Sequence, residues 1–235
     1  MPEVPRIVVL TGAGVSQESG LATFRDLGGI WSRVRLEEVA TPEAFAADPA
    51  RVHAFYSARR AQLIEPGVQP NAAHRALARL DAAWPADFLL VTQNVDDLHE
   101  RAGSTRMVQM HGALNRVRCT ACGAVTPWRE QLDMRTPCPS CSRTTLRPDI
   151  VWFGEMPMQM GRIAEALAGC TLFVSIGTSG QVHPAAGFVA EVRDHAHTVE
   201  LNLEQSAGSM LFDEVAQGPA TKSVPAFVDR LLATL

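Results

Sequence analysis

Residues 6–16 read RIVVLTGAGVS, an apolar run that leads into a glycine turn. The run 6–10 is rich in β-branched residues and leads into Thr11-Gly12-Ala13-Gly14, which predicts a fully buried strand followed by a glycine turn and a helix. Strands that are apolar on both sides are typical of parallel sheets covered on each face by helices. The stretch therefore predicts the first strand of an α/β fold.

Three later runs have the same apolar character, at 88–92, 172–177 and 198–203. Helical patterns occur at 159–168, 184–193 and 225–232, the last two with a proline near the expected first turn. Alternation of strands and helices predicts a doubly wound parallel sheet.

Two segments interrupt this alternation. Residues 27–84 are almost entirely helical in pattern, with Pro42, Pro49 and Pro70 near expected helix starts, and residues 116–147 are polar and carry cysteines. We interpret both as insertions that form a small lobe within one domain, 1–235, whose large lobe comprises about 1–26, 85–115 and 148–235. A cleft between lobes is a preferred place for a ligand.

Composition excludes several classes of protein. With 46% hydrophobic and 20% charged residues, the 235-residue chain is neither disordered nor a coiled coil. The net charge of -4 gives no electrostatic reason to expect nucleic acid or an anionic membrane as a main partner. No export signal is recognisable, and no run approaches the roughly 18 apolar residues of a membrane helix. We expect a soluble, cytoplasmic monomer.

Four cysteines have the spacing of a metal site. Cys119-x-x-Cys122 and Cys138-x-x-Cys141 are separated by fifteen residues, as in zinc ribbons. Four thiolates fill a tetrahedral zinc ion and leave no position for a catalytic water, so the zinc is expected to be structural. The alternative is four unrelated buried thiols. Cys170 stands alone in an apolar context and is expected in the core.

Polar residues follow several predicted strands. The glycine turn after the first strand can present backbone N–H groups to a phosphate, although Gln17 replaces the third glycine of the ordinary dinucleotide motif. A second turn, GTSG at 177–180, and the pair Asn202 and Glu204 end two further strands. Because ligands bind beyond the carboxyl ends of strands in open α/β sheets, these groups are expected around one crevice.

The segment TQNVD at 92–96 also ends a predicted strand. Its amides and carboxylate indicate a ligand site, or, alternatively, an Asn/Asp cap on the following helix. His111 follows an apolar stretch at the same expected edge. A lone histidine is more often structural, but its pKa near neutrality suits it for proton transfer.

These motifs occur together, in order and spacing, in the sirtuins. The chain resembles that family in GAGVS at 12–16, GLATFR at 20–25, TQNVD at 92–96, His111-Gly112, the four cysteines, WFGE at 152–155, GTS at 177–179 and NLE at 202–204. It most resembles the bacterial class III branch, whose Tyr-x-x-Arg is present as Tyr56 to Arg59. Many sirtuins have Pro-Asp where this chain has Ala22-Thr23, a departure also seen in class III.

The resemblance implies an NAD-dependent protein-lysine deacylase with a Rossmann-like large lobe and one structural Zn2+. It implies His111 as the general base, with Asn94 and Asp96 as catalytic partners. It further implies that NAD binds to Gly12, Ala13, Gly14, Ser16, Phe24, Arg25, Gln93, Asn94, Asp96, Gly177, Thr178, Ser179, Asn202 and Glu204. An acyl-lysine peptide would add as a strand between 153–155 and 180–182, contacting Phe153, Gly154, Glu155 and Val182. The products would be nicotinamide, lysine and O-acyl-ADP-ribose.

The class III resemblance implies that the acyl group is acidic, succinyl or malonyl, with acetyl also accepted. From composition alone, the alternative is an amphipathic helix whose arginines are solvated. Tyr56 and Arg59 are three residues apart in the helical stretch 50–64 and share a face, where a guanidinium and a phenol can bind a carboxylate. Arg51 and Arg60 are expected in solvent. The same site would also suit a protein ADP-ribosyltransferase or an NAD hydrolase, whereas a hydride-transferring dehydrogenase or a non-enzymatic zinc-ribbon module fits these residues less well.

Overall fold

The computed structural model describes residues 4–21 and 35–235 and contains two sheets. The larger has six parallel strands in the order β3-β2-β1-β7-β8-β9. These are β1 (Ile7–Thr11), β2 (Phe88–Thr92), β3 (Met107–Gln109), β7 (Leu172–Ile176), β8 (His197–Asn202) and β9 (Glu214–Gln217). From β1 the chain adds β2 and β3 on one side and then β7, β8 and β9 on the other. The topological switch point therefore lies between β1 and β7, where such folds bind ligands.

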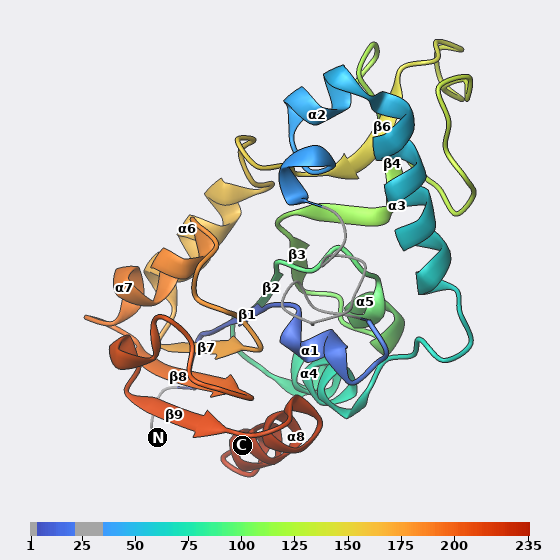
Figure 1. The fold of residues 1–235 in the computed structure, drawn as a ribbon. Helices are drawn as coiled ribbons and strands as arrows, with labels where there is room; N and C mark the ends of the chain where they lie inside the picture. Colours follow the sequence, from blue (N-terminus) through green and yellow to red (C-terminus); the bar gives the residue numbers. More distant parts are fainter. Residues whose placement is uncertain (1–3, 22–34) are drawn as a thin grey trace.

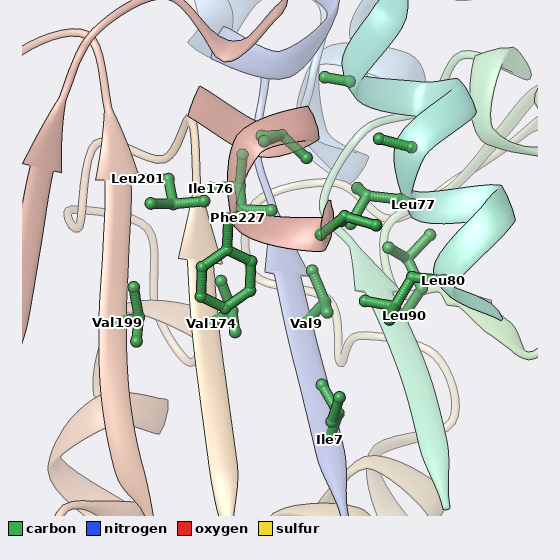
Figure 2. Packing of buried hydrophobic residues seen from close by; sticks show 14 of the residues in the cluster. Ile7, Val9, Leu77, Leu80, Leu90, Val174, Ile176, Val199, Leu201 and Phe227 are labelled. Carbon is green, nitrogen blue, oxygen red and sulfur yellow. The ribbon is translucent and has the colours of Figure 1, made fainter. Parts of the chain in front are cut away.

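Helices cover both faces of this sheet (Figure 1). On one face, α4 (Ala72–Ala83) and α8 (Ala220–Leu232) pack against each other and against the strands. Figure 2 shows Leu77, Leu80 and Phe227 from these helices above the strand residues Val9 and Val174. The other face is covered by α6 (Met160–Gly169), the 3-10 turn η3 (Ala185–Gly187) and α7 (Phe188–Val192). The predicted doubly wound parallel sheet is confirmed.

The small lobe combines helices with the second sheet and lies at the top of Figure 1. Its antiparallel sheet has the order β5-β4-β6, with β4 (Gly112–Cys119), β5 (Val125–Pro127) and β6 (Leu146–Ile150). The 3-10 turn η2 (Leu36–Glu38) precedes α2 (Pro42–Ala47) and α3 (Pro49–Leu63). Side chains of Val52, Phe55 and Leu63 form a separate core with Leu114 and Trp152.

The expected lobe boundary at residue 84 differs from the packing. Leu77 and Leu80 of α4 belong to the core of the large sheet, because that helix has one apolar face and presents it to β1 and β2. Its start after Pro70 agrees with prediction, since Asn71 caps the helix and accepts from the backbone N–H of Ala73 at 2.9 Å.

Other boundaries also shift. The expected helix 225–232 begins five residues earlier, because the carboxylate of Glu18 accepts from the backbone N–H and the hydroxyl of Thr221 and so caps α8 from a distant segment. Pro225 therefore lies inside the helix. The expected helix 184–193 is divided into η3 and α7. Two shorter elements complete the chain, α5 (Leu98–Ala102) and η4 (Ser209–Leu211).

Among the described residues, no helix is both long enough and apolar enough to cross a membrane.

Candidate active site

A cavity of about 770 Å³ lies between the lobes, at the carboxyl ends of the parallel strands. It brings together every expected NAD and peptide residue within the described ranges: Gly12, Ala13, Gly14, Ser16, Tyr56, Arg59, Gln93, Asn94, Asp96, His111, Phe153, Gly154, Glu155, Gly177, Thr178, Ser179, Val182, Asn202 and Glu204. Phe24 and Arg25 lie outside the described residues. The cavity confirms that the polar strand ends converge on one crevice.

The two glycine turns at the switch point interlock. The amides of Gly12 and Gly14 donate to the carbonyl oxygens of Ile176 and Gly177, at 3.0 and 2.9 Å. A Cβ on Gly14 would lie 2.8 Å from the Cα of Gly177, and Gly177 itself has a φ of +61°. Glycine is required here because the two backbones touch. These two amides are occupied by protein acceptors, which differs from the expected presentation of the turn's N–H groups to a phosphate.

Hydroxyl and amide groups at the ends of β7 and β8 face the same space. The side chain of Asn202 donates to the carbonyl oxygen of Thr178 at 2.7 Å, which joins the two strand ends. The hydroxyls of Thr178 and Ser179 accept from the backbone N–H groups of Gly180 and Gln181, at 3.1 and 3.3 Å. Their own hydrogens remain available to donate into the cavity.

Ser16, Asn94 and Asp96 form a hydrogen-bonded cluster in the cavity wall. The Ser16 hydroxyl donates to Oδ2 of Asp96 at 2.9 Å and accepts from the side-chain amide of Asn94 at 3.1 Å. Nε2 of the buried His74 lies 3.3 Å from the same hydroxyl, while its Nδ1 accepts from the backbone of Asn71. His74 therefore donates to Ser16, which directs the Ser16 hydrogen toward Asp96.

Asp96 occupies two positions that the sequence presented as alternatives, a helix cap and the wall of the cavity. Its Oδ1 accepts from the backbone N–H of Leu98 at 3.0 Å, which caps α5, while the same carboxylate lines the cavity. Burial raises the pKa of Asp96 above its usual range, and the bonds from Leu98 and Ser16 oppose that rise.

His111 is oriented by the backbone. Its Nδ1 lies 3.0 Å from the carbonyl oxygen of Gln93, so that nitrogen carries the proton and Nε2 is left as an acceptor. Burial lowers the pKa of His111 below 6.5, although the Gln93 carbonyl acts in the opposite direction. The imidazole is therefore neutral at pH 7 and can take up a proton at Nε2.

Tyr56 and Arg59 line the small-lobe side of the cavity, as their spacing on one face of α3 predicts. Tyr56 is 4% exposed, and burial raises its pKa well above 10. Burial also lowers the pKa of Arg59, and the Asp96 carboxylate acts to raise it. A guanidinium does not lose its proton in this pH range, so Arg59 provides a positive charge within the cavity.

The next residue, Arg60, is buried, which corrects the expectation that it is solvated. It is 2% exposed and donates to the carbonyl oxygens of Leu114 and Glu130, at 2.7 and 3.0 Å. Ser57, on the same side of α3, bonds to the backbone of Leu132. Arg51 is exposed and pairs with Glu38, as expected for a solvated arginine. One side of α3 thus faces the cavity, and another is bonded to the cysteine-bearing ribbon at 116–147.

Residues 153–155 form the rim of the cavity. The side chains of Phe153 and Val182, 53% and 39% exposed, both line the cavity. The carboxylate of Glu155 is bound by Arg147 at 2.6 and 3.0 Å and also accepts from the backbone N–H of Trp152. Since these contacts occupy the carboxylate, Glu155 can offer a ligand mainly its backbone.

The four ribbon cysteines converge on one point. Their sulfur atoms all lie within 4.8 Å of one another, with Cys119 and Cys141 at 3.6 Å and Cys122 and Cys138 at 3.8 Å. Tetrahedral zinc with Zn–S bonds of about 2.3 Å requires sulfur atoms about 3.8 Å apart, so these thiols fit the ion. The Thr145 hydroxyl beside Cys119 lowers the pKa of that thiol, which favours a thiolate ligand. Cys170 lies in the core, where burial raises its pKa to about 11.

Nothing in the sequence indicated a site role for His74 or Trp152. Trp152 lines the cavity and donates to Tyr56, whereas His74 is buried and reaches the cavity wall through Ser16. The capping-box position of His74 in α4 gives no sign of this contact.

Fold and site together define a class: two-lobed α/β proteins with a polar cavity at the switch point of a parallel sheet and a four-cysteine ribbon in the small lobe. The Sir2 family model matches residues 12–184, and the chain belongs to this family. The predicted family is confirmed.

Individual relatives extend the match to the whole chain. It is 53% identical to the NAD-dependent protein deacylase of Salmonella typhimurium over 237 residues, covering 100% of this chain and 87% of the relative. It is 54% identical over 240 residues to the protein of that name from Caulobacter vibrioides, covering 100% of both. A solved Sir2 homologue–NAD complex superposes with a TM-score of 0.88 at 37% identity, over 97% of this chain and 90% of that one. Sir2Af2 bound to a myristoylated histone peptide gives 0.74 at 27% identity, over 97% and 92%.

Proposed function

We propose that this chain is an NAD-dependent protein-lysine deacylase that removes acidic acyl groups, succinyl and malonyl, and also acetyl. The observation that carries the proposal is the single cavity shared by the glycine turns, His111 and the pair Tyr56 and Arg59. The relatives named NAD-dependent protein deacylase support it. The products would be lysine, nicotinamide and an O-acyl-ADP-ribose.

The large-lobe side of the cavity would hold NAD. The hydroxyls of Thr178 and Ser179 are suited to the phosphates, beside the glycine turn at 12–14, and Asn202 and Glu204 to the adenosine half. When bound, NAD supplies the ribose carbon that receives the acyl oxygen, with nicotinamide as the leaving group. Phe24 and Arg25 would act on the same ribose, a role that rests on the sirtuin resemblance.

Asn94 and Asp96 would orient the ribose, because their side chains are already held by Ser16. Such fixed groups favour a charge-separated transition state without reorganising during the reaction. His111 would accept the ribose hydroxyl proton at Nε2, since its Nδ1 is committed to Gln93.

The acyl group would enter between the lobes toward Tyr56 and Arg59. A carboxylate that leaves water needs charge and hydrogen bonds in compensation, which a guanidinium and a phenol can supply together. The peptide would add as a strand between 153–155 and 180–182, with the exposed side chains of Phe153 and Val182 on its two sides. Gly154 and Glu155 would contribute backbone groups.

Cys119, Cys122, Cys138 and Cys141 would hold one structural zinc ion, which would cross-link the ribbon. The expectations of a monomer, of a cytoplasmic location and of no nucleic-acid partner stay predictions.

A panel of peptides that differ only in the acyl group on one lysine tests the proposal. With NAD, we expect loss of succinyl, malonyl and acetyl in equal amount to nicotinamide release, and O-acyl-ADP-ribose in the mass spectrum. ADP-ribosylated protein instead would indicate a transferase, and free ADP-ribose without acyl loss would indicate an NAD hydrolase. Either result would overturn the proposal.

A further inference from the structure

The hydroxyl of Tyr56 has a fixed hydrogen-bond polarity. Nε1 of Trp152 lies 3.0 Å from the Tyr56 oxygen, and both side chains are buried, 2% and 4% exposed. An indole N–H can only donate, so the Tyr56 oxygen must be the acceptor. The hydrogen of Tyr56 is then directed away from Trp152.

Tyr56 keeps that hydrogen. Burial raises its pKa well above 10, so the phenol is neutral throughout the physiological range. Its ring is held edge-on against Phe55, with ring centroids 5.1 Å apart, and faces the cavity that Arg59 also lines. Accepting one hydrogen bond also strengthens a hydroxyl as a donor in the next one, because linked hydrogen bonds polarise each other.

Trp152 is itself held firmly. The Arg147 guanidinium lies 3.4 Å from the centroid of its ring, and Arg147 is bound in turn to Glu155. Glu155 accepts from the backbone N–H of Trp152 at 2.8 Å, and Phe45 packs against the indole with ring centroids 5.2 Å apart. The indole N–H is therefore a fixed donor.

We propose that Trp152 is a specificity-determining positioning residue: by donating to the Tyr56 oxygen, it commits that hydroxyl to act as a donor beside Arg59, and so favours an acyl chain that ends in a carboxylate. Without this bond, the hydroxyl could turn its lone pairs toward the acyl chain, which would repel a carboxylate. The inference rests on the proposed function and adds a residue outside the Tyr-x-x-Arg pair.

The test compares kcat/KM for succinyl-lysine and acetyl-lysine in one peptide, with full-length protein and saturating NAD. Trp152→Phe removes the N–H and should lower the succinyl-to-acetyl ratio about three- to tenfold, the range for one neutral hydrogen bond. Tyr56→Phe should lower it at least as much. The double variant should resemble Tyr56→Phe alone, because Trp152 acts through Tyr56.

A replacement of Trp152 that preserves shape guards against loss of folding. Site-specific incorporation of benzothienylalanine exchanges the indole N–H for sulfur and keeps the bicyclic ring over which Arg147 lies. It should reproduce the drop in ratio. Trp128→Phe is the matched control, because Trp128 donates to the Gln131 carbonyl away from the cavity, and it should leave the ratio unchanged.

Tyr56 is the chain's single tyrosine, so the tyrosine doublet in the Raman spectrum reports on this hydroxyl alone. The doublet should shift when Trp152 loses its N–H and should not shift in Trp128→Phe. A normal ratio with benzothienylalanine, an equal loss on both substrates, or additive effects in the double variant would overturn the inference. If the proposed acyl preference itself is wrong, Arg59→Met will leave the succinyl-to-acetyl ratio unchanged. If only the role of Trp152 is wrong, Arg59→Met will lower that ratio and the Trp152 variants will not.

Discussion

Nδ1 of His111 donates to the carbonyl oxygen of Gln93 at 3.0 Å. The main chain just after β2 thus selects the tautomer of His111, the residue of the cavity wall that we assign as the base. The bond leaves Nε2 free to accept a proton from the cavity.

Replacing His111 by alanine should reduce deacylation about 100-fold or more, the usual scale for a positioned general base. NAD binding, measured by calorimetry, should be largely retained, because the nucleotide side of the cavity is built from other residues. His197→Ala, which changes an exposed histidine at the far end of β8, is the control and should remain active. Normal turnover by His111→Ala would contradict the assignment.

The same imidazole should set the acid limb of the pH–rate profile. Because burial lowers the pKa of His111 below 6.5, the neutral, active form predominates at pH 7, and protonation removes activity only as the pH falls further. We expect kcat/KM to be flat from pH 7 upward and to decline below pH 6.5. An acid limb centred above pH 7 would exclude His111 as the base.

Metal analysis should find one zinc ion per chain, and chelation should lower the melting temperature and abolish activity. The loss is expected to be indirect, because the ribbon supports α3 through the bonds from Ser57 to Leu132 and from Arg60 to Glu130. Cys170→Ala, a change in the large-lobe core, should leave the zinc content unchanged. Full activity after replacement of all four ribbon cysteines would refute a structural zinc.

Arg59→Met should lower kcat/KM on succinyl-lysine by about tenfold to over a hundredfold, which corresponds to one charged hydrogen bond of roughly 1.5 to 3 kcal/mol. Acetyl-lysine places no charge near this residue, so its turnover should be spared. Arg51→Met removes an exposed arginine from the same helix and serves as the control. Equal damage to both substrates would mean that Arg59 supports the fold or NAD binding.

Two neighbouring, buried histidines should make the fold sensitive to acid. Burial lowers the pKa of His74 to about 4 and that of His99 well below 6.5, and the two rings lie 4.8 Å apart. The unfolded chain binds protons at these residues below pH 6.5 and the folded chain does not, so the free energy of unfolding should fall between pH 6.5 and 4. For His74 alone the loss is about 3 kcal/mol.

Urea unfolding at a series of pH values measures this loss. The double variant His74→Gln/His99→Gln should be less stable at pH 7.5 but should have a flatter pH dependence between 6.5 and 4. An unchanged slope would show that other groups govern the acid response.

Local patterns predicted much of the fold. The strands β1, β2, β7 and β8 agree with their predictions to within about one residue, because each is a short apolar run closed by a polar or glycine turn. The strand β9 was not predicted, since all four of its residues are exposed at the sheet edge and only Val215 and Ala216 are apolar, too short a run to indicate a buried strand. The start of α8 was missed because its cap, Glu18, comes from a segment 203 residues away.

For the site, the sequence alone determined which residue types stand at each strand end, the four-cysteine spacing and the shared helix face of Tyr56 and Arg59, because these depend on neighbours within a few residues. Three features came from the packing of distant segments: Trp152 donates to Tyr56, His74 orients Ser16, and Arg60 is buried beneath the ribbon. Those contacts join residues between 54 and 96 positions apart. A hydrogen bond between such residues depends on how the elements pack, and the periodicity of either element says nothing about its partner.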